Sequence, residues 1–125
     1  IKEVEKLNLD FQEFTNAGFM LGHGSIVSIP KNFNMVKYIH HLFKFTAEES
    51  CGKCFPGRLG SYRGKEMFDQ AVNKTNKIPM KLLNELLVTM KKGSLCALCG
   101  AIPVPIQNIL KYFTHEFKAD INQEA

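Results

Sequence analysis

Residues 49–60 read Glu49-Ser50-Cys51-Gly52-Lys53-Cys54-Phe55-Pro56-Gly57-Arg58-Leu59-Gly60. The stretch places two cysteines three positions apart, among glycines that allow tight turns. A second pair with the same spacing, Cys96 and Cys99, follows downstream, and these pairs account for all four cysteines of the chain. Paired Cys-x-x-Cys units, in a sequence that shows no sign of secretion, indicate metal or redox chemistry rather than disulfides.

Three uses of these cysteines remain open on the residues alone. Two separated pairs of thiolates are what a tetrahedral zinc ion or a cuboidal iron–sulfur cluster requires. Zinc ribbons leave roughly 15–20 residues between their pairs, and the gap between Cys54 and Cys96 is about twice as long. The third use is as buried thiols without a metal. The spacing favours a cluster, with zinc and free thiols as alternatives.

The composition is that of one ordinary globular chain. Its 125 residues are 45% apolar and 22% charged, and its apolar stretches are short and interrupted by charge, which excludes a membrane span. The net charge of +4 comes from lysines spread over the whole sequence. Because these lysines do not cluster with aromatic side chains, nucleic-acid binding is not expected.

Residues 1–31 differ from the rest of the chain. A glycine-rich segment, Gly18–Gly24, leads into the β-branched run Ser25–Ile29, which ends at Pro30. This run predicts a short strand. Beyond Pro30 the apolar residues recur at intervals of three and four, as they do on an amphipathic helix.

Two amphipathic helices are predicted on either side of the first cysteine pair. Asn34 is a favourable N-cap for the first helix. The second begins near Pro56, because proline suits the first turn of a helix. Its three glycines lie at turn spacing on one face, which predicts the close approach of a bulky group, either a cluster or a tightly packed helix. These glycines are Gly57, Gly60 and Gly64.

Two further helices are predicted on either side of the second cysteine pair. The third begins at Pro79 and ends at the run 91–93, where Gly93 is expected to form a left-handed cap. The fourth begins at Pro103 or Pro105 and continues through Phe117.

Together these helices predict a mainly α chain, with a four-helix bundle over residues 32–125. The cysteine pairs lie in the connections that precede the second and fourth helices. In an up-down bundle those two connections lie at the same end. Four sulfurs that are distant in sequence are therefore expected to meet there.

The first motif resembles a cluster-binding signature, Glu-Ser-Cys-Gly-x-Cys-x-Pro-Cys-Arg-x-Gly. It is found in the NADH-binding, FMN-carrying flavoprotein subunit of respiratory complex I and in related NAD-linked hydrogenases and formate dehydrogenases. The resemblance also includes the loop at Cys96 and the closing stretch 109–117. It implies that residues 1–31 are the end of a ubiquitin-like β-grasp domain, the soluble-ligand-binding type. Residues 32–125 would then form a four-helix iron–sulfur-binding domain.

In that family, three cysteines of the first motif and one downstream cysteine hold a single [4Fe-4S] cluster. Cys51, Cys54 and Cys96 match three of these ligands. The fourth position is Gly57, which has no side chain to bind iron, whereas Cys99 stands where the family requires no cysteine. We expect Cys99 to replace the missing ligand. The alternatives are a labile cluster with three cysteines and an exogenous ligand, and zinc in place of the cluster.

The resemblance implies an electron-transfer module that relays electrons from a flavin through the cluster to partner subunits. The partners would be a ferredoxin-like 2Fe-2S subunit and a larger iron–sulfur or catalytic subunit, in the cytoplasm or on the matrix-side peripheral arm of an organelle. No catalytic residue is expected here, and FMN and NAD would bind a separate N-terminal domain of the full subunit. The competing interpretation is a non-catalytic scaffold or docking domain, with structural zinc or no metal.

Overall fold

A computed structural model of the protein describes residues 4–122. The chain divides into two compact units, Ile1–Lys31 and Asn32–Ala125. The secondary structure is mainly α-helical, as the sequence predicts. Among the described residues, no helix combines the length and the apolar character needed to cross a membrane. The assignment of residues 1–31 to the end of a β-grasp domain stays a prediction.

The first unit has little regular structure. Its described residues, 4–31, contain one turn of 3-10 helix, Val4–Lys6 (η1), and one short helix, Phe11–Asn16 (α1). The carboxylate of Asp10 accepts hydrogen bonds from two N–H groups in the first turn of α1. The predicted strand over residues 25–29 is wrong, because this segment is irregular and the described residues 4–31 include no strand with which it could pair.

Helix α2, Met35–Glu49, forms where the first amphipathic helix is predicted. The side chain of Asn34 accepts a hydrogen bond from the N–H group of Lys37 at 3.0 Å, so the predicted cap is confirmed. The helix ends at Glu49, and the extended backbone of its C-cap residue Ser50 leads directly into Cys51. The first cysteine pair therefore begins where α2 stops.

The next helix is entered through a π-helical turn. Pro56–Gly60 forms this turn (η2), and Ser61–Val72 continues it as α3. The buried hydroxyl of Ser61 donates a hydrogen bond to the carbonyl of Gly57, one turn earlier. A π-turn holds one more residue than an α-turn, and such turns are frequent at functional sites. The sequence predicts the helix start near Pro56 but not the π-turn.

Helix α4, Met80–Gly93, begins directly after Pro79, as predicted. The predicted left-handed cap at Gly93 is wrong. Gly93 remains within the helix, and the C-cap is Ser94 with an extended backbone. The missing Cβ of Gly93 serves packing instead, because a Cβ there would lie 3.1 Å from the ring of Pro56.

The last part of the chain forms three short helices instead of one long one. They are Ala97–Ala101 (α5), Pro103–Tyr112 (α6) and Thr114–Phe117 (α7). The predicted fourth helix starts at Pro103 but is interrupted at Phe113, where φ is −114° and ψ is 25°. A two-residue parallel pairing of Ile78–Pro79 (β1) with Ile121–Asn122 (β2) ties the end of the chain to the start of α4.

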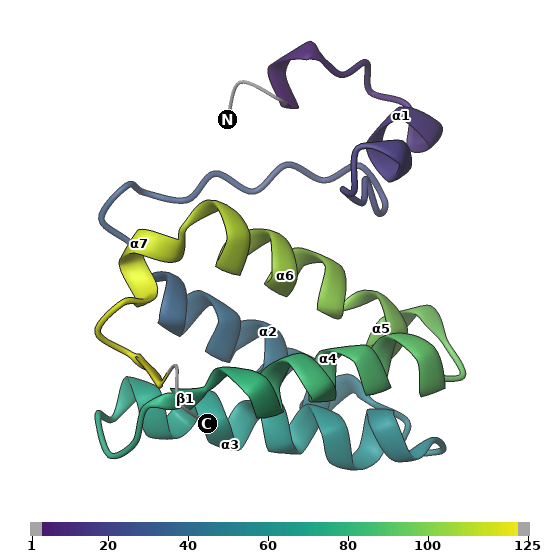
Figure 1. Cartoon of the computed structure of the whole chain (residues 1–125). Helices are drawn as coiled ribbons and strands as arrows, with labels where there is room; N and C mark the ends of the chain where they lie inside the picture. The colour runs from purple at the N-terminus through teal and green to yellow at the C-terminus, as the bar shows by residue number, and fades with distance from the viewer. Residues whose placement is uncertain (1–3, 123–125) are drawn as a thin grey trace. The chain divides into compact units, whose positions relative to one another are not determined.

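The longer helices of the second unit run back and forth. In Figure 1 the chain follows α2 towards one end, returns along α3, runs forward along α4 and returns along α6. The core is built from fully buried side chains of α2, α3, α4, α6, α7 and strand β1: Ile39, Phe43, Phe68, Ile78, Leu83, Leu87, Met90, Ile106 and Phe117. This path brings the α2–α3 and α4–α5 connections to the same end.

Candidate metal centre

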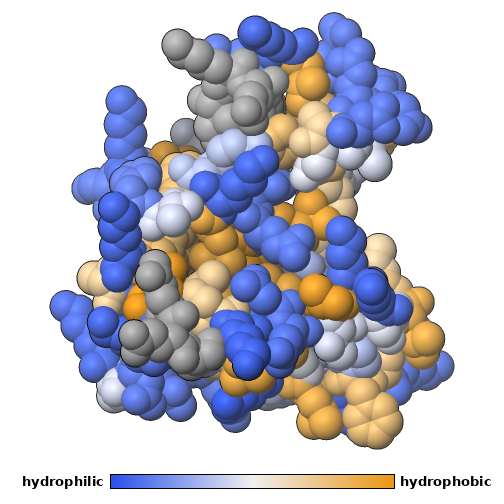
Figure 2. All heavy atoms as spheres, in the orientation of Figure 1, coloured by the Kyte–Doolittle hydropathy of each residue, from blue (hydrophilic) through white to orange (hydrophobic). Residues whose placement is uncertain are grey.

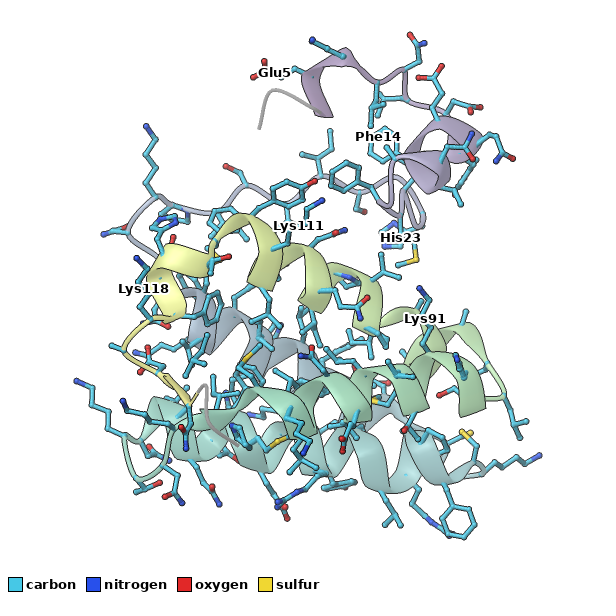
Figure 3. All side chains as sticks on the ribbon, in the orientation of Figure 1. Glu5, Phe14, His23, Lys91, Lys111 and Lys118 are labelled. Carbon is cyan, nitrogen blue, oxygen red and sulfur yellow. The ribbon has the colours of Figure 1, made fainter. Side chains whose placement is uncertain are left out.

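Both cysteine pairs lie at one end of the second unit. Cys51 and Cys54 belong to the α2–α3 connection, Cys96 immediately precedes α5, and Cys99 lies within it. These segments are found together on the right of Figure 1. In Figure 3 the same end is marked by Lys91, in the last turn of α4. We call this end, defined by the four cysteines, the thiol pole.

The first pair is carried by a turn that requires glycine. Gly52 has a φ of 69°, in the left-handed region that residues with a Cβ rarely adopt. Its N–H group donates a hydrogen bond to the hydroxyl of Ser50 at 3.3 Å. The carbonyl of Cys54 accepts a hydrogen bond from the N–H group of Arg58 at 2.9 Å. Cys54 thus stands at the entrance to η2.

The second pair is carried by the start of α5. Cys96 is the N-cap residue, and its carbonyl accepts a hydrogen bond from the N–H group of Gly100 at 3.1 Å. Cys99 follows within the helix and is only 2% exposed, whereas Cys96 is exposed. This pair therefore has one thiol at the surface, that of Cys96, and one in the interior, that of Cys99.

Gly57 faces one sulfur from each pair. A Cβ atom at Gly57 would lie 3.0 Å from the Sγ atom of Cys54 and 3.1 Å from that of Cys99. The hydroxyl of Ser50 is 3.1 Å from the same point and 3.8 Å from the sulfur of Cys99. The sulfurs of Cys54 and Cys99 cannot be farther apart than the sum of their two distances to the Cβ position of Gly57. Thiols 45 positions apart in sequence therefore meet beside Gly57.

The environment of the thiol pole shifts the pKa values of two thiols in opposite directions. Backbone hydrogen bonds from Leu95 and then Gly57 lower the pKa of Cys54. Removal from water raises the pKa of Cys99, although its hydrogen bond with Ser50 works against this. Charge repulsion from each of the other three cysteines raises it further. The other three thiols are therefore within electrostatic range of Cys99.

In the described part of the chain, the thiol pole does not hold a preassembled site for a single metal ion. Across residues 4–122, no three His, Cys, Asp or Glu side chains are grouped closely enough to hold one ion. Zinc needs every ligand sulfur about 2.3 Å from the same ion, whereas the thiolates of a cuboidal cluster bind separate iron atoms. The sulfurs of Cys54 and Cys99, which lie near each other beside Gly57, could bind separate iron atoms of such a cluster.

Apolar side chains surround the thiol pole at the surface. Phe55, Leu59 and Leu95 are 69%, 57% and 80% exposed. Figure 2 shows hydrophobic residues gathered at this end, over the ends of α3, α4 and α5. The guanidinium group of Arg58 lies 5.2 Å from the ring centre of Phe55. The surface around the thiols therefore combines apolar side chains with the positive charge of Arg58.

Comparison with known families matches most of the second unit. Residues 37–120, which include both cysteine pairs, match the NADH-ubiquinone oxidoreductase-F iron-sulfur binding region. The chain belongs to this family. Membership in the F-type iron–sulfur region confirms the predicted relationship and points to a [4Fe-4S] cluster as the cofactor.

Curated relatives of this F-type region come from two kinds of enzyme. The chain is 31% identical over 118 residues to the F-type subunit of the NADH-quinone oxidoreductase of Rickettsia bellii. It is 28% identical over 117 residues to the HndC subunit of the NADP-reducing hydrogenase of Solidesulfovibrio fructosivorans. The alignments cover 94% and 93% of this chain but 28% and 24% of the relatives. The chain thus spans about a quarter of the length of these relatives.

Solved structures confirm the mainly α fold of the F-type region. An NAD+-reducing [NiFe]-hydrogenase in its H2-reduced state superimposes with a TM-score of 0.69 at 22% identity. The superposition covers 77% of this chain and 17% of that one. The air-oxidized state of the same kind of hydrogenase gives a TM-score of 0.67 at 24% identity. At these identities the likeness concerns the fold alone.

The structure brings all four predicted site residues to one end but holds them differently. Cys54 and Cys99 converge beside Gly57, while Cys51 and Cys96 are exposed. Their role as ligands stays a prediction.

Two serines at the thiol pole are not predicted from the sequence. Ser50 approaches the sulfur of Cys99, and the buried hydroxyl of Ser94 contributes to lowering the pKa of Cys54. The sequence signals were that Ser50 matches the serine of the family motif and that both serines stand within two residues before a cysteine.

Proposed function

We propose that this chain is an electron-transfer module that holds one [4Fe-4S] cluster at its thiol pole. The observation that carries the proposal is the convergence of thiols from two distant connections at one end of the bundle. Membership in the F-type iron–sulfur region supports it independently of that geometry. When bound, the cluster supplies one-electron transfer, which protein side chains here do not provide.

The chain's own residues hold and tune this centre. Cys51, Cys54 and Cys96 supply thiolates from the positions that match the family motif. The backbone groups of Leu95 and Gly57 that hydrogen-bond the sulfur of Cys54 draw negative charge from it. Hydrogen bonds to ligand sulfurs and solvent exposure are among the features that set the reduction potential of such centres.

In this role the chain relays electrons from a flavin to acceptors in other subunits. The support comes from the relatives, which are named as subunits of an NADH-quinone oxidoreductase and of an NADP-reducing hydrogenase. In the proposed assembly, FMN and NADH bind elsewhere in the full subunit. A ferredoxin-like 2Fe-2S subunit and a larger iron–sulfur or catalytic subunit are the partners. The assembly lies in the cytoplasm or, in an organelle, on the matrix side.

A reductive titration without oxygen tests this function. The full chain is supplied with iron and sulfide and then reduced stepwise while its visible absorption is followed. We expect a brown protein whose broad absorption bleaches on reduction and returns on reoxidation. A double variant, Cys51→Ala with Cys54→Ala, is the control and should stay colourless. A parent chain that remains colourless under these conditions, or binds zinc in place of iron, would contradict the proposal and favour the scaffold interpretation.

A further inference from the structure

We propose that Cys99 is the fourth ligand of the cluster and substitutes for the side chain that position 57 lacks. This inference rests on the proposed function and concerns only where the last thiolate comes from. Three positions of the family motif keep their cysteine, and the fourth position is Gly57. The structure indicates which group takes the place of the missing fourth ligand.

The sulfur of Cys99 lies close to the point that the Cβ of a side chain at position 57 would occupy. The Cβ of such a side chain would be 3.1 Å from this sulfur and 3.0 Å from the sulfur of Cys54. Both contacts are closer than Cβ atoms normally make with non-bonded neighbours. A side chain at position 57 would therefore require the sulfurs of Cys99 and Cys54 to shift by a few tenths of an ångström. The absence of a Cβ at Gly57 leaves room for both sulfurs.

The surroundings of Cys99 are not those of a cysteine that only fills a core. A structural buried cysteine behaves as a small hydrophobic residue. The sulfur of Cys99 instead approaches the hydroxyl of Ser50 at 3.8 Å and shares the space beside Gly57 with the sulfur of Cys54. Although it is only 2% exposed, its thiol therefore lies among polar groups and other thiols.

The α5 helix can present both of its cysteines to the same centre. Cys96 is its N-cap and Cys99 is its third residue, and the side chain of an N-cap residue lies over the second and third positions of the helix that follows. Two ligands would then come from the α2–α3 connection and two from the start of α5, where Cys96 precedes the helix and Cys99 lies within it. This two-plus-two arrangement replaces the three-plus-one arrangement that the family motif implies.

A ligand-swap experiment tests the proposal. Iron and acid-labile sulfide per chain, and the EPR spectrum, are measured for the parent and for Cys99→Ala after reconstitution without oxygen. The double variant Gly57→Cys/Cys99→Ala moves the thiol back to position 57. The matched control is Gly57→Ala/Cys99→Ala, which supplies the Cβ without a sulfur. A further variant, Ser50→Ala, tests whether the neighbouring hydroxyl is the ligand instead.

We expect the parent to hold four irons per chain and Cys99→Ala to hold three or fewer, with an altered EPR spectrum. The cysteine double variant should regain four irons, whereas the alanine double variant should not. Ser50→Ala should retain the iron content of the parent. The proposal is overturned if Cys99→Ala keeps four irons and the parent spectrum, or if iron loss follows Ser50→Ala instead.

Two controls keep the result interpretable. Helix content and thermal unfolding of the metal-free variants, followed by circular dichroism, establish that each one folds. If Cys99→Ala does not fold, Cys99→Ser retains the size of the side chain, and an unchanged EPR spectrum for it overturns the proposal. A parent chain that binds no iron would mean that the proposed function fails. If the parent binds four irons and Cys99→Ala has the same iron content and EPR spectrum, only this inference fails.

Discussion

The ring of Phe43 packs directly against Gly64, in the space where a side chain at position 64 would lie. Phe43 belongs to α2 and Gly64 to α3, the two helices that flank the first cysteine pair. Phe43 is fully buried, and its ring centre lies 5.6 Å from that of Phe68. The absence of a Cβ at position 64 thus allows the close approach of α2 and α3.

Gly64→Ala should therefore destabilise the bundle, although alanine is the better helix former. The new Cβ would overlap the ring of Phe43, and overpacking of this kind costs about 1–3 kcal/mol. The gain in helix propensity is about 1 kcal/mol, so we expect a net loss in the free energy of unfolding, measured by urea denaturation. Gly100→Ala is the matched control, because its Cβ would meet its nearest neighbour at 3.5 Å. Equal responses of the two variants would contradict this packing.

Ser61→Ala should weaken the entrance to α3. The buried hydroxyl of Ser61 donates to the carbonyl of Gly57, and loss of such a bond costs about 0.5–1.5 kcal/mol. Thr89→Ala removes a bond that also runs from a hydroxyl to the carbonyl four residues earlier, on the exposed face of α4, to Glu85 at 2.8 Å. Urea denaturation should show a larger loss for Ser61→Ala than for Thr89→Ala. The reverse order would count against a stabilising role for the bond at the π-turn.

The thiols of the metal-free chain should differ in reactivity. Alkylation requires the thiolate, and the pKa of Cys54 is lowered whereas that of Cys99 is raised. As the pH falls from alkaline values, Cys99 should lose its thiolate at a higher pH than Cys54. Iodoacetamide labelling, followed by mass spectrometry at several pH values, should find Cys54 labelled faster throughout. Denaturation in urea should abolish the difference between the labelling rates of Cys54 and Cys99. Equal labelling rates in the folded chain would contradict the prediction.

Local signals predicted the helices of the second unit well. Asn34 indicated the start of α2, and the prolines at 56, 79 and 103 indicated the starts of later helices. These signals are local, because capping and the restricted φ of proline act within one turn. Features that depend on distant partners were missed. The run at 25–29 has the composition of a strand but no strand to pair with in residues 4–31, and the pairing of Ile78 with Ile121 joins segments far apart in sequence.

The candidate site was predictable to a similar extent. Cysteine spacing indicated one shared centre, and the resemblance singled out Gly57 and Cys99 as a lost and a gained position. That the sulfur of Cys99 lies beside Gly57 depends on how α5 packs against η2, which no local pattern encodes. The roles of Ser50 and Ser94 depend on the same packing. The approach of Ser50 to Cys99 and the effect of Ser94 on the pKa of Cys54 therefore became visible only in the fold.

The most direct measurement is the iron and acid-labile sulfide content of the full chain, purified and reconstituted without oxygen. The account predicts about four irons and four sulfides per chain, with no bound zinc. Zinc at one equivalent per chain, or iron without sulfide, would show that the sulfurs at the end of this bundle do not hold an iron–sulfur cluster.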